Sequence, residues 1–155
     1  MLFRSRPVSP ELVEARRRLV RHYKVPFDRG ALSWYRDGRD GVAFHRDREM
    51  RYLDDTVVAI LTLGGPRPFQ LKPLHPPAGR SRRSYDSDEP SLDLAPADGD
   101  LLVLGGRCQA DWLHAVPQVR ALDVPGRMSV QWRWSSRTGP PDESPSFRAP
   151  RNFSR

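Results

Sequence analysis

Two histidines and an aspartate have the residue types and the spacing of a metal centre. His45 and Asp47 lie two residues apart, so on a strand both side chains project from one face and reach the same cation. His114 follows just after the apolar segment LLVLGG. Two histidines and one carboxylate are the ligand set that holds non-haem Fe(II) and leaves coordination positions open. The three residues therefore predict an iron centre.

A structural zinc ion is the alternative reading of the same residues. Such a site takes four protein ligands, and the fourth is usually a sulfur atom. Cys108 is the only cysteine of the chain and so the only candidate for that ligand. From these residues alone, Fe(II) and a structural zinc ion both remain candidates.

A second group of polar residues lies on the segment RMSVQWR, which begins at Arg127 and ends at Arg133. The two-residue period of a strand puts both arginines on one face, together with Ser129 and Gln131. Two arginines on the inner face of a barrel need anionic partners. Their Cα atoms lie roughly 20 Å apart, and long side chains leaning inward could hold the two ends of a small dicarboxylate. The alternative is that these four polar residues lie on a solvent-exposed face of a sheet and bind no ligand.

The elements that must position these residues are one helix and about seven or eight short strands. Ser9 and Pro10 form a helix start, and apolar residues then recur at helical spacing, which predicts an amphipathic helix over 10–24. Strands are expected at 32–35, 42–47, 56–63, 69–72, 92–94, 101–104 and 127–134. The run at 56–63 is apolar throughout, which indicates burial on both faces. One helix followed by many strands predicts a mainly β sandwich or barrel.

The chain divides into three parts by pattern. Residues 1–30 form an N-terminal helical segment that packs on the core, 31–136 form the core itself, and 137–155 form a basic tail with little apolar content that we expect to be disordered. No apolar run reaches the ~20 residues of a membrane span, and no signal-like segment opens the chain. A single cysteine excludes an internal disulfide and fits a reducing cytoplasm. We expect a cytoplasmic monomer.

The net charge of +7 is concentrated at the two ends of the sequence. Residues 1–30 carry eight basic against three acidic side chains, and residues 31–134 carry fourteen of each. Basic ends favour a polyanionic partner such as nucleic acid, through neutralisation of phosphates. The alternative is that the two basic ends of the chain only keep the protein soluble.

Four ordered segments resemble one known family. These are WYRDGRDGVAFHRDRE, VVAILTLGGPRPFQLKP, GDLLVLGGRCQADWLHAVPQV and RMSVQWRW, and they span about residues 31–135. In order and spacing they resemble the AlkB-like Fe(II)/2-oxoglutarate-dependent dioxygenases. The resemblance implies a double-stranded β-helix, or jelly roll, and the two cofactors Fe(II) and 2-oxoglutarate.

The resemblance also implies roles for individual residues. His45, Asp47 and His114 match the iron ligands. Arg127 and Tyr35 match the residues that hold the distal carboxylate of 2-oxoglutarate, and Arg133 matches the arginine near its metal-binding end. The remaining implied co-substrate positions are Ser33, Ser129 and Leu71, the last on the same strand as Phe69.

Some positions differ from the family pattern. Ser33 stands where an asparagine often assists 2-oxoglutarate binding, and Ser129 replaces an asparagine two residues after Arg127. Both keep a hydroxyl that forms hydrogen bonds, so we expect co-substrate affinity to be weakened and not lost. Glu49 matches an acidic position near the substrate base. Trp34 could stack on a base, although strand tryptophans are commonly core residues.

The implied activity is oxidative demethylation of N-alkylated nucleobases in DNA or RNA, as in the repair of alkylation damage, with release of formaldehyde, succinate and CO2. Only 44 residues precede His45, fewer than in family members that grip a flipped nucleotide with an N-terminal lid. Two alternatives therefore stay open. One is the same chemistry on a protein or small molecule, and the other is a non-catalytic remnant that binds nucleic acid.

Overall fold

The computed structural model describes residues 2–4, 9–74, 91–120 and 124–136. Within these ranges the chain forms two helices and nine strands. In chain order they are β1 (Leu2–Arg4), α1 (Pro10–Tyr23), β2 (Ala31–Tyr35), β3 (Val42–His45), β4 (Thr56–Gly64), β5 (Phe69–Pro73), β6 (Leu92–Leu94), β7 (Leu101–Gly106), α2 (Cys108–Asp111), β8 (Trp112–Val116) and β9 (Arg127–Ser135).

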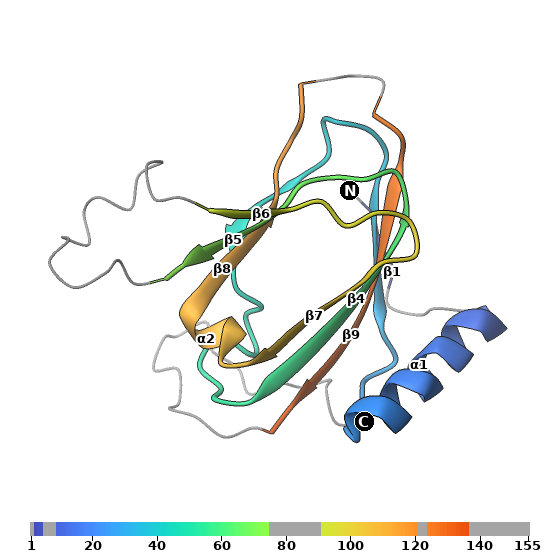
Figure 1. Cartoon of the computed structure of the whole chain (residues 1–155), viewed down its shortest axis with the longest axis vertical. Coiled ribbons are helices and arrows are strands. Elements are labelled where there is room, and N and C mark those ends of the chain that lie inside the picture. Colours follow the sequence, from blue (N-terminus) through green and yellow to red (C-terminus); the bar gives the residue numbers. More distant parts are fainter. Residues whose placement is uncertain (1, 5–8, 75–90, 121–123, 137–155) are drawn as a thin grey trace, which may run out of the picture.

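The strands form two antiparallel sheets (Figure 1). The larger sheet has the order β1-β2-β9-β4-β7, and the smaller has the order β3-β8-β5-β6. Strands that are distant in sequence therefore lie side by side, as in a jelly roll, and the expected mainly β fold is confirmed. The strands expected from the sequence all occur, with ends that differ by one or two residues.

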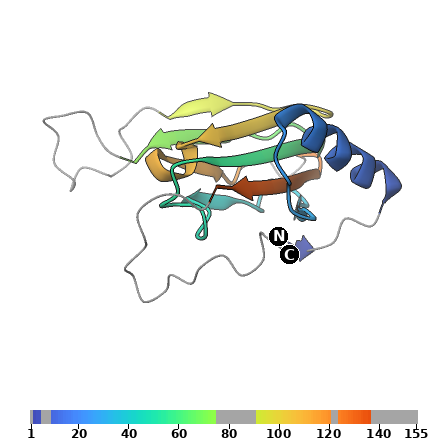
Figure 2. The ribbon, with the colours of Figure 1, turned by 90° about the horizontal axis from the view of Figure 1, so that it is seen from below.

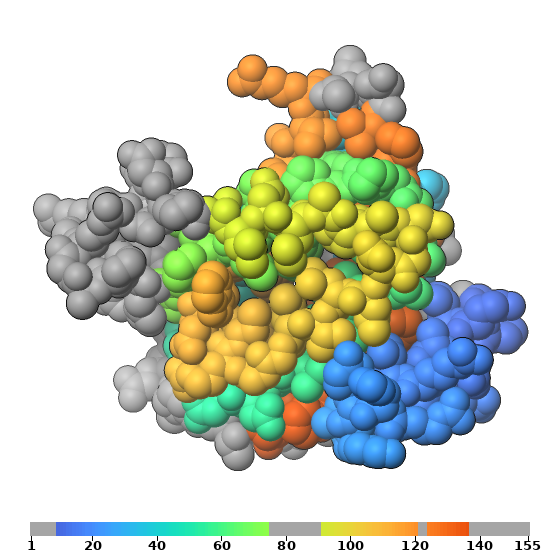
Figure 3. Space-filling model, in the orientation of Figure 1, coloured from blue at the N-terminus to red at the C-terminus, as the bar shows by residue number. Residues whose placement is uncertain are grey.

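Helix α1 begins and ends where its sequence predicts. The Ser9 side chain accepts a hydrogen bond from the backbone N–H of Leu12, and Pro10 occupies the first turn. Lys24 ends the helix in the left-handed conformation. The helix lies along one side of the strands in two perpendicular views (Figure 1 and Figure 2), and it forms a distinct ridge on the surface (Figure 3).

The larger sheet separates two hydrophobic clusters. On the side of α1, Leu19 packs with Ala59, Val130 and the fully buried Trp132. On the other side, between the sheets, a second cluster contains Tyr35, Met50, Val58, Ile60, Phe69, Leu104 and Val116. β4 contributes to both clusters, which confirms that it is buried on both faces, as its unbroken apolar run predicts.

Three elements are present without a specific expectation from the sequence. These are β1, the four-residue helix α2 and the strand β8, which carries His114. In addition, β3 ends at His45 and not at Asp47. The expected disordered tail at 137–155 lies outside the described residues. No helix in the described part of the chain is long and apolar enough to cross a membrane.

Candidate metal and co-substrate site

The register between β3 and β8 brings the two histidines together. His45 and His114 are direct cross-strand partners, and their ring centroids are 4.2 Å apart. Asp47 lies in the turn that follows β3, and one of its carboxylate oxygens, Oδ1, is 3.9 Å from His45 Nε2 and 3.8 Å from His114 Nε2. One ligand atom from each residue lies within 4.8 Å of the others. The predicted cluster therefore exists in the fold.

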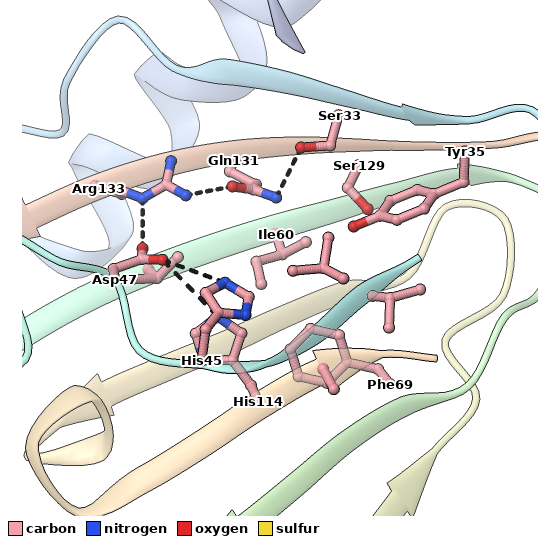
Figure 4. A pocket seen from close by; sticks show the side chains of 14 residues that line it. Ser33, Tyr35, His45, Asp47, Ile60, Phe69, His114, Ser129, Gln131 and Arg133 are labelled. Atoms are coloured by element: carbon pink, nitrogen blue, oxygen red, sulfur yellow. Dashed lines mark hydrogen bonds and ion pairs between the residues drawn. The ribbon is translucent and has the colours of Figure 1, made fainter. Parts of the chain in front are cut away.

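The placement of Asp47 differs from the sequence argument. We expected strand alternation to aim Asp47 beside His45, but β3 ends at His45. Asp47 is held instead by two residues that are distant in sequence. Its backbone N–H donates to Gln109 Oε1 at 2.9 Å, and its carboxylate Oδ2 accepts from Arg133 Nε at 2.6 Å. The other oxygen is left facing the histidines (Figure 4).

A hydrogen bond also determines which ring nitrogen of His45 faces Asp47 without a proton. His45 Nδ1 lies 2.9 Å from the carbonyl oxygen of Ala43, an acceptor only, so Nδ1 carries the proton and Nε2 presents its lone pair toward Asp47. The His114 ring stacks on Phe69, with 5.8 Å between centroids and 9° between planes. Two imidazole nitrogens and a carboxylate oxygen converge, and this donor set fits a divalent transition metal such as Fe(II).

Charge and burial keep Asp47 and His114 in the forms that bind metal. Burial alone would raise the pKa of Asp47, but the adjacent charge and hydrogen bond of Arg133 lower it, so the carboxylate stays ionised. Burial lowers the pKa of His114 to about 4, and the nearby His45 contributes to the same effect. His114 is therefore neutral at pH 7.

The lowered pKa of His114 makes the stability of the metal-free protein depend on pH. The unfolded chain takes up this proton near pH 6.5, but the folded chain does so only near pH 4. Between these values the unfolded state binds more protons, so the free energy of unfolding is greatest above pH 6.5 and falls by about 3 kcal/mol as the pH reaches 4. Urea denaturation at pH 7 and pH 4.5 should show the loss. A His114→Gln variant with an equally steep pH dependence would contradict this assignment.

A cavity of about 190 Å³ begins at the three residues and runs between the sheets (Figure 4). One wall is polar and comes from β2 and β9: Ser33, Tyr35, Ser129, Gln131 and Arg133. The remaining wall is apolar: Val42, Val58, Ile60, Phe69, Ala115 and Val116. A polar strip facing an apolar wall suits a small ligand with charged ends and a short aliphatic chain.

Arg127 lies beside this cavity, next to Tyr35, but does not line it. Its guanidinium is buried and donates to the carbonyl of Arg67 and to Thr62 Oγ1, while its Nε has no partner. Arg67 is also buried, and its guanidinium lies 5.9 Å from the Tyr35 ring. No carboxylate among the described residues forms an ion pair with either arginine, so this end of the cavity has an excess of positive charge.

Besides Arg127, three residues expected at the site are not part of the cavity wall. Leu71 is the strand partner of His114 and packs against the inner cluster. Glu49 lies in the turn two residues after Asp47, where its charge acts on Arg133. Trp34 is 48% exposed and alternates with the buried Ser33 and Tyr35, so its side chain projects away from the cavity.

Sequence reasoning missed Gln131 and Gln109 at the metal and the cavity, and it left one alternative open. Gln131 was placed on the polar face of its strand but not among the site residues, and Gln109 carried no signal because nothing in the sequence joins it to Asp47. Cys108 is not in the metal-binding cluster of the described residues. Burial raises the pKa of its thiol, which disfavours the thiolate that zinc would bind.

Comparison with known proteins assigns the class. The family model of the 2OG-Fe(II) oxygenase superfamily matches residues 3–139, and the chain belongs to this superfamily. Its cofactors are Fe(II) and 2-oxoglutarate, as the sequence implied. The crystal structure of EvdMO1 has the same fold, with a TM-score of 0.53 over 84% of this chain and 32% of that chain, at 18% identity.

Within the superfamily, the chain is similar to AlkB homologues. The mouse protein alpha-ketoglutarate-dependent dioxygenase alkB homolog 3 is 31% identical over 109 residues, which cover 70% of this chain and 37% of that protein. The Arabidopsis thaliana protein DNA oxidative demethylase ALKBH2 is 33% identical over 115 residues, 66% of this chain and 36% of that protein. The chain thus spans little more than a third of the length of these relatives. The AlkB-like resemblance is confirmed.

Proposed function

We propose that this protein is an Fe(II)- and 2-oxoglutarate-dependent dioxygenase that demethylates N-alkylated nucleobases in DNA or RNA. The observation that carries the proposal is the convergence of His45, Asp47 and His114 at one end of a cavity whose polar wall includes Arg133. Such a site holds a metal and a carboxylate-bearing co-substrate side by side.

Each part of the site has a task in this proposal. His45, Asp47 and His114 hold the metal, and Arg133 keeps the Asp47 carboxylate ionised and turned toward the histidines. Bound Fe(II) and 2-oxoglutarate supply, with O2, the oxidation of the N-methyl carbon, and the co-substrate leaves as succinate and CO2. Arg127 and Tyr35 orient the distal carboxylate, while the apolar wall keeps water from the reacting groups.

Two observations support a nucleic-acid substrate. The relatives include a protein named DNA oxidative demethylase. On α1, the side chains of Arg17, Arg18 and Arg21 all lie within 4 Å of the single carboxylate of Glu14 and are about 70% exposed. Three guanidinium groups around one carboxylate leave a net positive surface, which attracts phosphates.

The proposal is tested with purified protein, Fe(II), 2-oxoglutarate and O2, using oligonucleotides that carry N-methylated adenine or cytosine, as DNA and as RNA. We expect loss of the methyl mass from the oligonucleotide, with formaldehyde and succinate formed in equal amounts. Asp47→Ala should give neither product.

The other candidate functions predict different outcomes. Turnover of 2-oxoglutarate that no methylated oligonucleotide stimulates would contradict a nucleobase substrate and favour a protein or a small molecule. Binding of oligonucleotide by the wild-type protein without any turnover of 2-oxoglutarate would contradict the enzymatic function altogether.

A further inference from the structure

Gln109 is a fully buried residue of the short helix α2 that contacts the backbone of a candidate metal ligand. Its Oε1 accepts a hydrogen bond from the backbone N–H of Asp47 at 2.9 Å. Because an N–H group only donates, the amide atom of Gln109 that faces it must be the oxygen. The Nε2 group of Gln109 then has no partner among the described residues. A buried amide with unpaired donors is unfavourable for stability, so the oxygen is the part of this side chain that has a task.

This oxygen takes the place of a strand partner for Asp47. β3 ends at His45, so its ladder with β8 does not extend to Asp47. The Asp47 side chain is only 11% exposed, and a backbone N–H in such surroundings needs an acceptor. Gln109 supplies the acceptor from a segment 62 residues away. Asp47 therefore has a fixed backbone position although it lies outside the sheet.

Two further contacts join α2 to the turn that follows β3. Arg46, the residue before Asp47, donates from Nη1 to the carbonyl oxygen of Ala110 at 3.1 Å. Arg107, the residue before α2, forms an ion pair with Asp54 at the far end of the same turn. The turn that carries Asp47 is thus attached to α2 at its beginning and at its end.

The same helix also determines where His114 lies. α2 ends at Asp111 and β8 begins at the next residue, so Gln109 and His114 belong to one continuous backbone segment (Figure 1). The carbonyl oxygen of Asp111 accepts a hydrogen bond from the N–H of Leu74 at 2.7 Å, which attaches this segment to the end of β5. The bond from Gln109 to Asp47 therefore helps to set the separation of the two ligands, which is 3.8 Å from Asp47 Oδ1 to His114 Nε2.

We propose that Gln109 is a positioning residue of the metal centre, which fixes the backbone of Asp47 relative to His114. This inference rests on the proposed function, because it needs a metal ion at the three ligands. Arg133 and Gln109 have different tasks: Arg133 turns the Asp47 carboxylate toward the histidines, and Gln109 places the backbone from which that carboxylate extends. Without Gln109 the turn must be ordered again each time metal binds, which lowers the affinity.

The test measures metal binding, without turnover. Co(II) alone is titrated against the purified protein, and its visible absorption gives the dissociation constant. Gln109→Met keeps the length of the side chain and removes the accepting oxygen. We expect the constant to rise about 10- to 100-fold, as for other residues that orient a metal ligand. Gln109→Glu keeps an accepting oxygen at the same place and should bind Co(II) clearly more tightly than Gln109→Met.

Hydrogen exchange separates the accepting oxygen from the negative charge that Gln109→Glu introduces. In the metal-free protein, exchange of the Asp47 N–H, followed by NMR, should become faster in Gln109→Met and stay slow in Gln109→Glu. Leu19→Ala is the control for a general loss of stability, because it removes a buried side chain on the opposite side of the larger sheet. Its dissociation constant for Co(II) should equal that of the wild-type protein.

Two results would overturn the proposal. One is wild-type affinity for Co(II) in Gln109→Met. The other is an equal loss of affinity in Gln109→Met and Gln109→Glu, because the packing of α2 and not the accepting oxygen would then explain it. The proposed function fails separately, and this assignment stands, if the wild-type protein binds Co(II) but gives no visible charge-transfer band with Fe(II) and 2-oxoglutarate added without oxygen.

Discussion

Replacing Asp47 by alanine should abolish metal binding and destabilise the fold at the same time. The side chain is one of three candidate ligands and also the only carboxylate that forms an ion pair with Arg133 among the described residues. Its removal should weaken binding of Co(II), measured from its visible absorption, by more than about 100-fold. It also removes the ion-pair partner of the Arg133 guanidinium, whose side chain is only 17% exposed, and this loss costs about 3–5 kcal/mol of unfolding free energy in urea denaturation.

A double variant separates the two effects. Adding Arg133→Met to Asp47→Ala removes the unpaired charge, so most of the lost stability should return while metal binding stays absent. Asp93→Asn, at an exposed carboxylate of β6, is a matched control and should change neither quantity. An unaltered Co(II) titration of Asp47→Ala would show that Asp47 is not a ligand.

Replacing Arg127 by methionine should affect the co-substrate and spare the metal. The buried guanidinium has no carboxylate partner among the described residues, so an anionic ligand at this end of the cavity would provide one. Loss of a buried charge pair costs about 2–5 kcal/mol, which is a rise of about 30-fold or more in the dissociation constant of 2-oxoglutarate. Anaerobic titration of the charge-transfer band measures this change.

The free energy of unfolding of Arg127→Met should differ from that of Asp47→Ala. Arg127→Met loses two hydrogen bonds but also removes an unpaired buried charge, so the free energy of unfolding should change by less than about 2 kcal/mol. Arg18→Met, on the exposed face of α1, is the matched control for co-substrate affinity. Wild-type affinity for 2-oxoglutarate in Arg127→Met would assign the distal carboxylate to another residue.

The parts of the site that were predicted correctly depend on local periodicity. In β9, the alternation of polar and apolar residues places Ser129 and Arg133 on the cavity wall and Trp132 in the opposite cluster, as the two-residue period requires. The members of the metal cluster were predicted from the residue types of His45, Asp47 and His114, although Asp47 lies beyond the end of β3 and is not placed by strand alternation. Each of these signals lies within a few residues of sequence.

The parts that were missed depend on contacts between distant segments. Gln109 meets the backbone of Asp47 across 62 residues, and Arg67 reaches the carbonyls of Asp40 and Pro117. In each of these hydrogen bonds one partner is a backbone atom. Every residue has the same backbone atoms, so the residue type at that position gives no signal in the sequence. The short helix α2 was missed for a different reason, because four residues are too few to show a helical period.

The position of β9 has a consequence for how the protein is made. This strand follows every other described element in sequence, yet it lies in the middle of the larger sheet, between β2 and β4. Until it has left the ribosome, β2 and β4 have no common partner and their facing edges are open to other chains. It also carries Arg133, which holds Asp47 in place. A nascent chain that stops short of β9 therefore cannot close the larger sheet, and it lacks the Arg133 side chain that holds the Asp47 carboxylate beside the two histidines.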